Sequence, residues 1–511
     1  MASQKLSARE AASKKRGKPK QYTATEANWS APAKAAAAPS KRKADQLSSE
    51  PPTKKRSTQD KKRAEPSRPE INKAPTQILN VLVFGEGENA ELGLGPNRTE
   101  SKVPRLNPFL DAKDAGSFRI VQLACGGMHT VALTADDKIV TWGVNDAGAL
   151  GRPTEWEGGL REISDDEDEE GEGDDETGDL NPLESTPTEV VSTGFEGGVC
   201  FVQVVAGDNC SFALTAVGTV YGWGTFRNAQ GDECFGFDSQ GKKVKRQDVP
   251  VLIHAVKDII QLACGTNHVL ALDKHGSIWG WGINDEYQLG RRLFSRGHQS
   301  SYVPQQIRVC RGKVKYIASG QCHSFAVDQS DNVWAWGRNS NCEAGYSPAS
   351  TRDRSSHLLH PVKIQSLGKA GVTHLAGGGN HSCAVTADGR CFAWGKMDSG
   401  QLGIDFSAAQ LGDATLVRRG IRDRPEVCTR PTLVNGVGRV KDAACGTDHT
   451  IFVNSEGKAY ATGFGLQGQL GLGSDDDVSV AQLMTAKSVR ERKITWAGAG
   501  GGFSIVAEVA E

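Results

Sequence analysis

The chain has 511 residues, 38% of them hydrophobic, and 60 Lys and Arg side chains nearly balance 61 Asp and Glu side chains, for a formal net charge of −1. No apolar run approaches the roughly 20 residues that span a bilayer, and the Lys-rich N-terminus is unlike a secretory signal, so we expect an intracellular protein without a membrane span. The 12 cysteines show no C-x-x-C spacing, which argues against a zinc site or a disulfide framework and favours reduced core residues.

Residues 1–76 are predicted to form a disordered basic tail, because Lys and Arg recur in clusters and few apolar residues are available to build a core. Within "KRKADQLSSEPPTKKR" at 41–56, two basic clusters lie ten residues apart, the layout of a bipartite nuclear import signal. The cluster residues are Lys41, Arg42, Lys43, Lys54, Lys55 and Arg56. The same charge would attract DNA phosphates with salt-sensitive affinity. We therefore expect a nuclear, chromatin-associated protein that binds an import receptor.

Two short motifs recur through the rest of the chain. The first opens with Trp-Gly or Phe-Gly, as in "WGINDEYQLGR" at 281–291 and "WGKMDSGQLG" at 394–403. Its seven copies place the glycine of the opening pair at 85, 143, 224, 282, 337, 395 and 465, with spacings of 58, 81, 58, 55, 58 and 70 residues. A period near 58 residues is typical of one supersecondary unit per repeat.

The second motif, for example "ACGTNHVLAL" at 263–272, also occurs seven times. One of its positions holds His in five copies and Cys210 or Phe503 in the other two. Because a catalytic His would be needed only once, we interpret these side chains as hydrogen-bonding groups inside the blades. The five are His129, His268, His323, His381 and His449.

Together the motifs predict an all-β fold, a seven-bladed β-propeller over residues 77–511. In "CAVTADGRCFAWG" at 383–395, Asp388 and Gly389 are expected to supply the pair of positive φ angles of a tight hairpin. A four-stranded sheet with two apolar faces must pack against a neighbour on both sides, and a closed ring satisfies every sheet. The first unit lacks one motif and the last unit lacks the other, so strands from both chain ends are expected to complete one blade.

The long spacing between the second and third copies contains "EISDDEDEEGEGDDETGD" at 162–179, which has no basic residue. We interpret this insertion as a solvated acidic loop that could also screen basic, histone-like partners.

The stretch "GFGLQG" at 463–468 fits G-x-G-x-x-G, the fingerprint of a loop that cradles a dinucleotide pyrophosphate. That use requires a helix directly after the loop and an acidic residue about 20 positions on. Here "QLGLGSDDD" follows, without an amphipathic helical pattern. Recurrence of the glycines explains them without a ligand, so we expect no cofactor. A dinucleotide-dependent enzyme is the alternative that this stretch alone suggests.

In a symmetric scaffold, function is expected where one copy departs from the others. The third unit replaces the usual turn by "TFRNAQG" at 225–231. This loop would project an interface anchor made of Phe226, Arg227, Asn228 and Gln230. The alternative is that Phe226 packs into a neighbouring blade.

Two further departures carry charge. Asp208 stands where other copies have Gly, Thr or Gln, and it either faces a basic partner or caps a turn. The fourth unit extends into "RRLFSRGHQSSYVP" at 291–304, where Arg291, Arg292 and Arg296 either contact an acidic surface or stay solvated.

The paired motifs, "TFRNAQG", the "AGD" turn and the basic tail together resemble the regulator of chromosome condensation family, seven-bladed propellers that exchange the nucleotide of the small nuclear GTPase Ran. The resemblance covers about residues 77–511. It implies that the segment beginning at Thr225 is the family's β-wedge, pressed against the GTPase, and that Asp208 lies on the GTPase-facing rim. It also implies that Arg296 belongs to a loop that reaches histones and that the tail binds DNA.

Three positions differ from the family pattern. Asn267 replaces an acidic residue, Asn380 replaces a functional His, and Glu88 stands where the family tends to have another carboxylate. The two asparagines keep hydrogen bonds but lose charge, so partner binding is expected while the exchange rate is left open.

Such a factor breaks no covalent bond, so the resemblance implies neither a catalytic residue nor a metal. It would bind the nucleotide-free GTPase more tightly than the loaded form, and by linkage its binding weakens the nucleotide. The alternative is a chromatin-bound interaction propeller without exchange activity.

Overall fold

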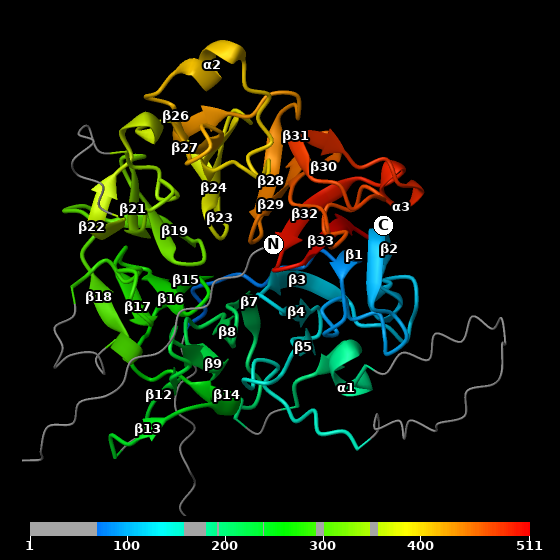
Figure 1. Cartoon of the computed structure of the whole chain (residues 1–511). Coiled ribbons are helices and arrows are strands. Elements are labelled where there is room, and N and C mark those ends of the chain that lie inside the picture. The colour runs from blue at the N-terminus through cyan, green and yellow to red at the C-terminus, as the bar shows by residue number, and fades with distance from the viewer. Residues whose placement is uncertain are drawn as a thin grey trace, which may run out of the picture. The chain divides into compact units, whose positions relative to one another are not determined.

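The computed structural model describes residues 69–157, 180–191, 194–238, 240–292, 301–347 and 356–510. In the unit Ser67–Glu511 these residues form seven antiparallel sheets around a central axis, as Figure 1 shows. The predicted seven-bladed propeller is therefore confirmed. The import clusters at 41–56 and the acidic segment 162–179 lie outside the described residues.

We number the blades 1 to 7 and give their strands from the axis outward. Blade 1 comprises β32 (Ile494–Ala499), β33 (Phe503–Val509), β1 (Leu79–Glu86) and β2 (Glu100–Leu106). Blade 2 comprises β3 (Ile120–Cys125), β4 (His129–Thr134), β5 (Ile139–Gly143) and β6 (Thr188–Glu189). Blade 3 comprises β7 (Phe201–Ala206), β8 (Cys210–Thr215), β9 (Val220–Gly224) and β14 (Gln247–Leu252). Blade 4 comprises β15 (Ile259–Cys264), β16 (His268–Asp273), β17 (Ile278–Gly282) and β18 (Gln305–Ile307).

Blade 5 comprises β19 (Val314–Ser319), β20 (His323–Asp328), β21 (Val333–Arg338) and β22 (His357–Lys363). Blade 6 has a fifth strand and comprises β23 (Val372–Gly377), β24 (His381–Thr386), β25 (Cys391–Lys396), β27 (Pro425–Leu433) and β26 (Val417–Arg419). Blade 7 comprises β28 (Val440–Cys445), β29 (His449–Asn454), β30 (Ala459–Gly463) and β31 (Val478–Leu483).

Short elements decorate the blades. Two small hairpins leave blade 3, formed by β10 (Phe226–Arg227) with β11 (Glu233–Cys234) and by β12 (Gly236–Phe237) with β13 (Lys243–Val244). The helices are α1 (Pro182–Ser185), α2 (Ala408–Gly412) and α3 (Lys487–Arg490), with 3₁₀ turns at Pro108–Leu110 and Gln365–Leu367. Among the described residues, no helix combines the length and apolar character needed to cross a membrane.

Strands from both chain ends close the ring, as expected. In blade 1, β1 pairs with the whole of β33, from Leu79 opposite Val509 to Gly85 opposite Phe503. Because these strands come from opposite ends of the propeller sequence, their ladder inside blade 1 closes the ring.

The propeller unit begins earlier than the predicted boundary after residue 76. The backbone N–H groups of Ile71 and Asn72 both donate to the Ala216 carbonyl, at 2.8 and 3.0 Å. The Asn72 side-chain amide donates to the Thr215 and Ile259 carbonyls, at 3.1 and 2.9 Å. Residues just before β1 are therefore attached where blades 3 and 4 meet.

The recurring glycine is the last or the second-last residue of the third strand of each blade and has a positive φ, between 92° and 114°. Its seventh member is Gly463, not Gly465 as the spacing suggested, because Gly463 is the one paired with the His position at His449. A Cβ on Gly463 would stand 2.4 Å from the Asp448 carbonyl oxygen. The first glycine of "GFGLQG" therefore packs against the chain's own backbone, which accounts for the glycine at this position of the repeat.

The hairpin turn at 386–390 differs from its expected form. Gly389 has a φ of +84°, whereas Asp388 is not among the residues with positive φ. The Gly389 N–H donates to the Thr386 carbonyl at 2.8 Å, and the Thr386 N–H donates to the Arg390 carbonyl at 2.9 Å. One left-handed residue after an ordinary turn thus suffices, as in three-residue hairpin loops.

The recurring His side chains link neighbouring blades, whereas the sequence suggested bonds inside each blade. His323 Nε2 of blade 5 lies 2.7 Å from Ser382 Oγ of blade 6, and that hydroxyl donates to the Glu343 carbonyl in blade 5 at 2.8 Å. Trp394 Nε1 of blade 6 donates to the same carbonyl at 2.9 Å. We call this set an interblade latch. The other His contacts, of 2.8 to 2.9 Å, are His129 with Ser211, His268 with Ser324, His381 with Thr450 and His449 with Ser504.

The His of each latch is neutral at pH 7, because burial disfavours the charged imidazolium. Since the hydroxyl hydrogen goes to a carbonyl, the imidazole must donate from Nε2, which assigns the tautomer. Burial lowers the pKa of His129 and His381 to about 4 and that of His268 and His449 to about 3.

We expect the latches to make folding stability acid-sensitive. A folded-state pKa below the unfolded value means that the unfolded chain binds the proton first, so stability is full above about pH 6.5 and falls toward pH 4. For His381 the loss amounts to about 3 kcal/mol. Urea unfolding of the wild type between pH 7 and 4.5 should show this decline, with a smaller slope in His381→Gln. The exposed His254→Gln is the control, and equal slopes in all three proteins would contradict the latch.

Candidate partner-binding face

One face of the propeller gathers every residue predicted to contact the GTPase. Because the strands of a blade are antiparallel, the turns between first and second strands lie at the same end as the loops between third and fourth strands. We call this end the wedge face and the opposite end the back face. The inner turns of the wedge face are residues 126–128, 207–209, 265–267, 320–322, 378–380, 446–448 and 500–502.

Backbone hydrogen bonds join these inner turns into a belt around the axis. The Asp208 N–H donates to the Thr266 carbonyl, and the Thr266 N–H donates to the Gln321 carbonyl, both at 3.0 Å. Similar bonds run from Gly127 to Gly207, from Gln321 to Gly378, from Gly379 to Thr447 and from Gly501 to Gly127. The belt uses the amide groups of the turns and fixes their side chains relative to one another.

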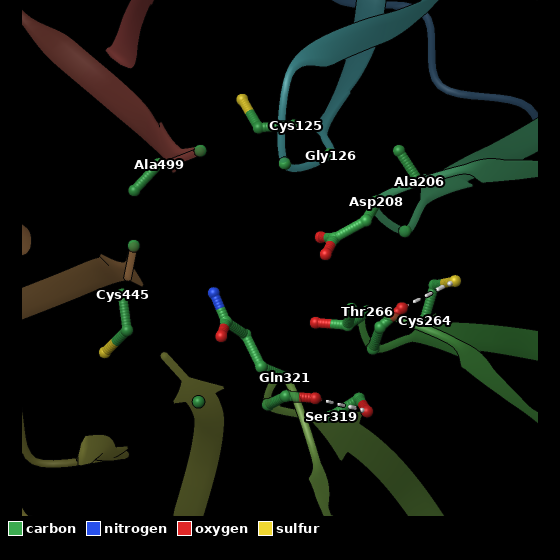
Figure 2. Close-up of a pocket in the computed structure, with 17 residues that line it drawn as sticks. Cys125, Gly126, Ala206, Asp208, Cys264, Thr266, Ser319, Gln321, Cys445 and Ala499 are labelled. Atoms are coloured by element: carbon green, nitrogen blue, oxygen red, sulfur yellow. Dashed lines mark hydrogen bonds between the residues drawn. The ribbon is translucent and has the colours of Figure 1, made fainter. Parts of the chain in front are cut away.

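The belt surrounds a small polar cavity of about 80 Å³. Figure 2 shows Asp208, Thr266 and Gln321 pointing into it from three successive blades. Gln321 Nε2 crosses to Thr447 Oγ1 of blade 7 at 3.0 Å. In the described part of the chain, no side chain donates to the Asp208 carboxylate. Burial without a partner raises the pKa of Asp208 to about 6.

The expectation that Phe226 projects from the surface is wrong, and the alternative of packing is correct. The Phe226 ring is fully buried and stacks on Phe212 and Phe235, each with a centroid distance of 6.2 Å. Trp281 of blade 4 belongs to the same cluster. Thr225 is buried as well, and its hydroxyl donates to the Lys245 carbonyl at 2.6 Å. Both residues therefore anchor the hairpin to the propeller.

The tip of the β10–β11 hairpin is the exposed part of the wedge. Arg227 and Gln230 are exposed, and Asn228 is half-buried. The Asn228 side-chain oxygen accepts from the N–H groups of Gln230 and Asp232 at 3.1 and 2.7 Å, which shapes the turn. Arg227 is held along the hairpin by Glu233, with nitrogen to oxygen distances of 3.2 and 2.6 Å.

Asn267 holds the base of the wedge. Its side-chain oxygen, from blade 4, accepts the Arg227 backbone N–H at 2.8 Å. An amide oxygen serves this acceptor role as a carboxylate would, so the lost charge does not disturb the hairpin.

Asn380 is the centre of a polar network between blades 5 and 6. Its side-chain oxygen accepts from Arg338 Nη2 and Asn341 Nδ2, both at 3.1 Å. Arg338 Nε also donates to the fully buried Glu343 carboxylate at 3.0 Å. Burial raises the pKa of Glu343, and the Arg338 charge opposes that shift.

Glu88 is exposed on the loop that follows β1. Glu86 is half-buried beside it and bonds to Gln467 of blade 7, and burial followed by the Glu88 charge raises the Glu86 pKa. Sequence reasoning missed Glu86, although its position two residues before Glu88 signals a carboxylate pair. It also missed two apolar side chains on this face, Met128 at 42% and Leu466 at 66% exposure.

The predicted chromatin contacts in blade 4 divide into three cases. Arg291 is half-buried and bonds to Gln305, and burial lowers its pKa. Arg292 is exposed, and Arg296 lies outside the described residues. Nowhere in the described ranges do three or more His, Cys, Asp or Glu side chains gather as a metal site would require.

The fold and this face define a propeller built to contact another protein, with one hairpin standing on the rim of a polar opening. The family model of the RCC1-like domain matches residues 80–506. The guanine nucleotide exchange factor SRM1 of Saccharomyces cerevisiae is 34% identical, over 84% of this chain and 87% of its own length.

Two solved structures agree with this match. Prp20p of Saccharomyces cerevisiae, described with its binding to Gsp1p and histones, is 33% identical with a TM-score of 0.73, over 85% of this chain and 92% of that one. Yeast RCC1 (Prp20) bound to Kap60 is 31% identical with a TM-score of 0.74, over 89% of this chain and 97% of that one. The chain belongs to the regulator of chromosome condensation family.

The buried aromatic cluster generates a stability prediction. Replacing Phe226 by Ala removes the ring that stacks on Phe212 and Phe235 and leaves a cavity at the base of the wedge. We expect a loss of about 3–5 kcal/mol in the free energy of unfolding, measured by urea unfolding. Phe226→Leu, which retains apolar volume, should cost less. An unfolding midpoint in Phe226→Ala equal to that of the wild type would contradict the anchoring role.

Proposed function

We propose that this chain is a guanine nucleotide exchange factor for a Ran-type small GTPase and that it acts by binding alone. The observation that carries the proposal is the β10–β11 hairpin, whose base is held by Asn267 and whose exposed tip lies on the same face of the propeller as the Asp208 carboxylate. The name of the relative SRM1 and the reported binding of Prp20p to Gsp1p support the same activity.

The proposed mechanism is linkage between two binding equilibria. The wedge face would bind the nucleotide-free GTPase more tightly than the loaded form. By linkage, binding of the wedge face would lower the affinity of the GTPase for its nucleotide by the same factor. An acceleration of 10⁵-fold corresponds to about 7 kcal/mol of preferential binding to the release transition state. The tip of the wedge would displace the phosphate-binding elements, while Asp208 and Glu88 attract basic side chains. No step of this mechanism makes or breaks a covalent bond.

The predicted site residues take different parts in this scheme. Arg227, Asn228 and Gln230 at the wedge tip, with Asp208 and Glu88, would touch the GTPase. The positioning residues would be Thr225, Phe226, Asn267 and Asn380, because the side chains of all four are engaged within the propeller.

We further propose that the protein works in the nucleus on chromatin. Prp20p is described with binding to histones, and yeast RCC1 (Prp20) is described bound to Kap60. In this chain the basic clusters between Lys41 and Arg56 would bind an import receptor and DNA, while Arg292 and Arg296 would face an acidic histone surface. The tail would thereby keep exchange activity at the chromosome.

Release of a fluorescent guanine nucleotide from the GTPase tests the exchange activity. The wild-type chain should accelerate release by several orders of magnitude, and Asn228→Ala/Gln230→Ala should lose at least about tenfold, or 1.4 kcal/mol. Lys441→Ala, exposed at the back-face end of β28, is the matched control. Release that the wild type leaves unchanged, despite measurable binding to nucleosomes, would favour a chromatin-bound interaction propeller.

The raised pKa of Asp208 predicts a pH dependence. The carboxylate ionises as pH rises through about 6, so affinity for a basic partner should increase between pH 5 and 7 and then level off. Asp208→Asn should weaken binding and remove this dependence.

The same variant should weaken partner binding but increase folding stability at neutral pH. A raised carboxyl pKa means that stability is full below the unfolded pKa and is lost as pH rises through about 6, here by up to about 3 kcal/mol. Asp208→Asn should therefore raise the melting temperature at pH 7.5.

The binding prediction has its own contradicting outcome. If the wild type and Asp208→Asn bind the partner with the same pH profile, Asp208 is excluded from the contact.

A further inference from the structure

Blade 6 carries a hairpin that the repeat motifs do not account for. Its outermost strand β26 pairs with β27, with Val417 opposite Cys428 and Arg418 opposite Val427. The connecting residues turn tightly, because the Gly420 N–H donates to the Arg424 carbonyl at 2.9 Å and Asp423 has a φ of +52°. We call residues 417–428 the arginine hairpin.

The arginine hairpin extends beyond the wedge face. Lys396 at the end of β25 lies opposite Val427, and the Met397 N–H donates to the Glu426 carbonyl at 2.9 Å. Residues 420–424 continue past this last pairing, and each residue of an extended strand adds about 3.3 Å. The tip therefore stands above the ends of the inner strands.

The base of the hairpin is braced against the propeller. Arg419 Nη2 donates to the Leu411 carbonyl at the end of α2, at 3.0 Å. Arg418 Nη2 donates to the Ser340 carbonyl of blade 5 at 2.7 Å. The residue after Ser340 is Asn341, which bonds to Asn380. The hairpin is thus continuous with the polar network of the proposed GTPase-binding face.

The tip combines an apolar side chain with unpaired positive charge. Ile421 has a relative exposure of 108%, and Arg422 and Arg424 are exposed. Within the described residues, neither of these two guanidinium groups has a hydrogen-bond or ion-pair partner. A nucleic acid would contact the two arginines through its phosphates but would leave Ile421 exposed to water. A protein partner would use all three side chains, because an apolar anchor flanked by Arg is typical of a protein interface.

The arginine hairpin and the wedge flank the central opening. Blades 3 and 6 lie on opposite sides of the axis, with β14 at the bottom and β26 at the top of Figure 1. Both hairpins arise from loops between third and fourth strands and so project from the same face. A partner that covers the opening and meets the wedge is therefore in position to meet the arginine hairpin.

We propose that the arginine hairpin is a second arm that grips the GTPase held on the wedge face. It would seat Ile421 in an apolar recess and set Arg422 and Arg424 against carboxylates beside that recess. The proposal rests on the proposed exchange function, because it assigns the occupant of the hairpin as the same GTPase.

Charge reversal at the tip tests the second arm in the full chain. We expect Arg422→Glu/Arg424→Glu to slow association with nucleotide-free GTPase about tenfold at low ionic strength, and less at high ionic strength, because steering by charge is screened by salt. Ile421→Ser should instead speed dissociation. The control is Arg439→Glu/Lys441→Glu, two exposed cations at the back face, one directly before β28 and one at its second position. Melting temperatures should match the wild type, since the altered side chains are exposed.

The outcomes separate this proposal from the exchange function. Wild-type exchange with unchanged association and dissociation in both tip variants would overturn the second arm alone. Loss of DNA binding in the tip variants, with GTPase binding intact, would also overturn it and assign the hairpin to nucleic acid. Failure of the wild type to bind the GTPase would overturn the exchange function and, with it, the arm.

Discussion

The structure depends on the interblade latch, a buried chain of hydrogen bonds from an imidazole to a hydroxyl to a carbonyl. In the latches of His129, His268 and His323 the same carbonyl also receives the indole N–H of a Trp. Each latch joins the second strands of two neighbouring blades. Its carbonyl lies in the loop that follows the third strand of the blade that supplies the His. Since the groups are buried, breaking one bond would strand polar atoms in an apolar interior, which costs more than the bond contributes. Repetition of the latch, with the belt of amides at the axis, holds the wedge face as one rigid surface.

The two junctions without a His latch show what replaces it. Between blades 3 and 4, Cys210 takes the His position and Val269 takes the hydroxyl position, and both belong to one apolar cluster. Phe226 lies in that cluster, so the wedge stands where a polar latch has given way to aromatic packing. Between blades 1 and 2, Phe503 takes the His position, and no partner bonds Thr130 Oγ1 within the described residues. At both junctions an apolar contact thus replaces the polar latch. At the junction of blades 3 and 4 that apolar contact also anchors the wedge hairpin.

The repeated features of the fold could be predicted from the sequence, and the features that depend on unrepeated contacts could not. Seven copies of two motifs suffice for the blade count and for ring closure through the chain ends. The burial of Phe226 depends on Phe212, Phe235 and Trp281, which come together only after folding. The partner of each His lies in the next repeat, although a hydroxyl residue directly after the His position was a readable signal. The arginine hairpin could not be predicted in this way, because it is an insertion and a comparison of repeats gives information only on positions that recur.

Asp208 shows how a rigid scaffold can reserve binding energy for a partner. Its own N–H and the amides of the neighbouring turns are committed to the belt, so the carboxylate faces the cavity without the donors that usually stabilise a buried charge. The belt prevents the turns from rotating to supply them. A cationic side chain that enters from the wedge face would provide the interaction that the fold withholds, and the protein would not need to reorganise to accept it. The electrostatic cost borne by the free propeller would then become affinity in the complex. The inner turns hold one other carboxylate, Asp448, which lies 3.6 Å from Lys396 Nζ and accepts from Gln401 Nε2 at 3.3 Å, so among these turns Asp208 is the carboxylate that no side chain of the described residues engages.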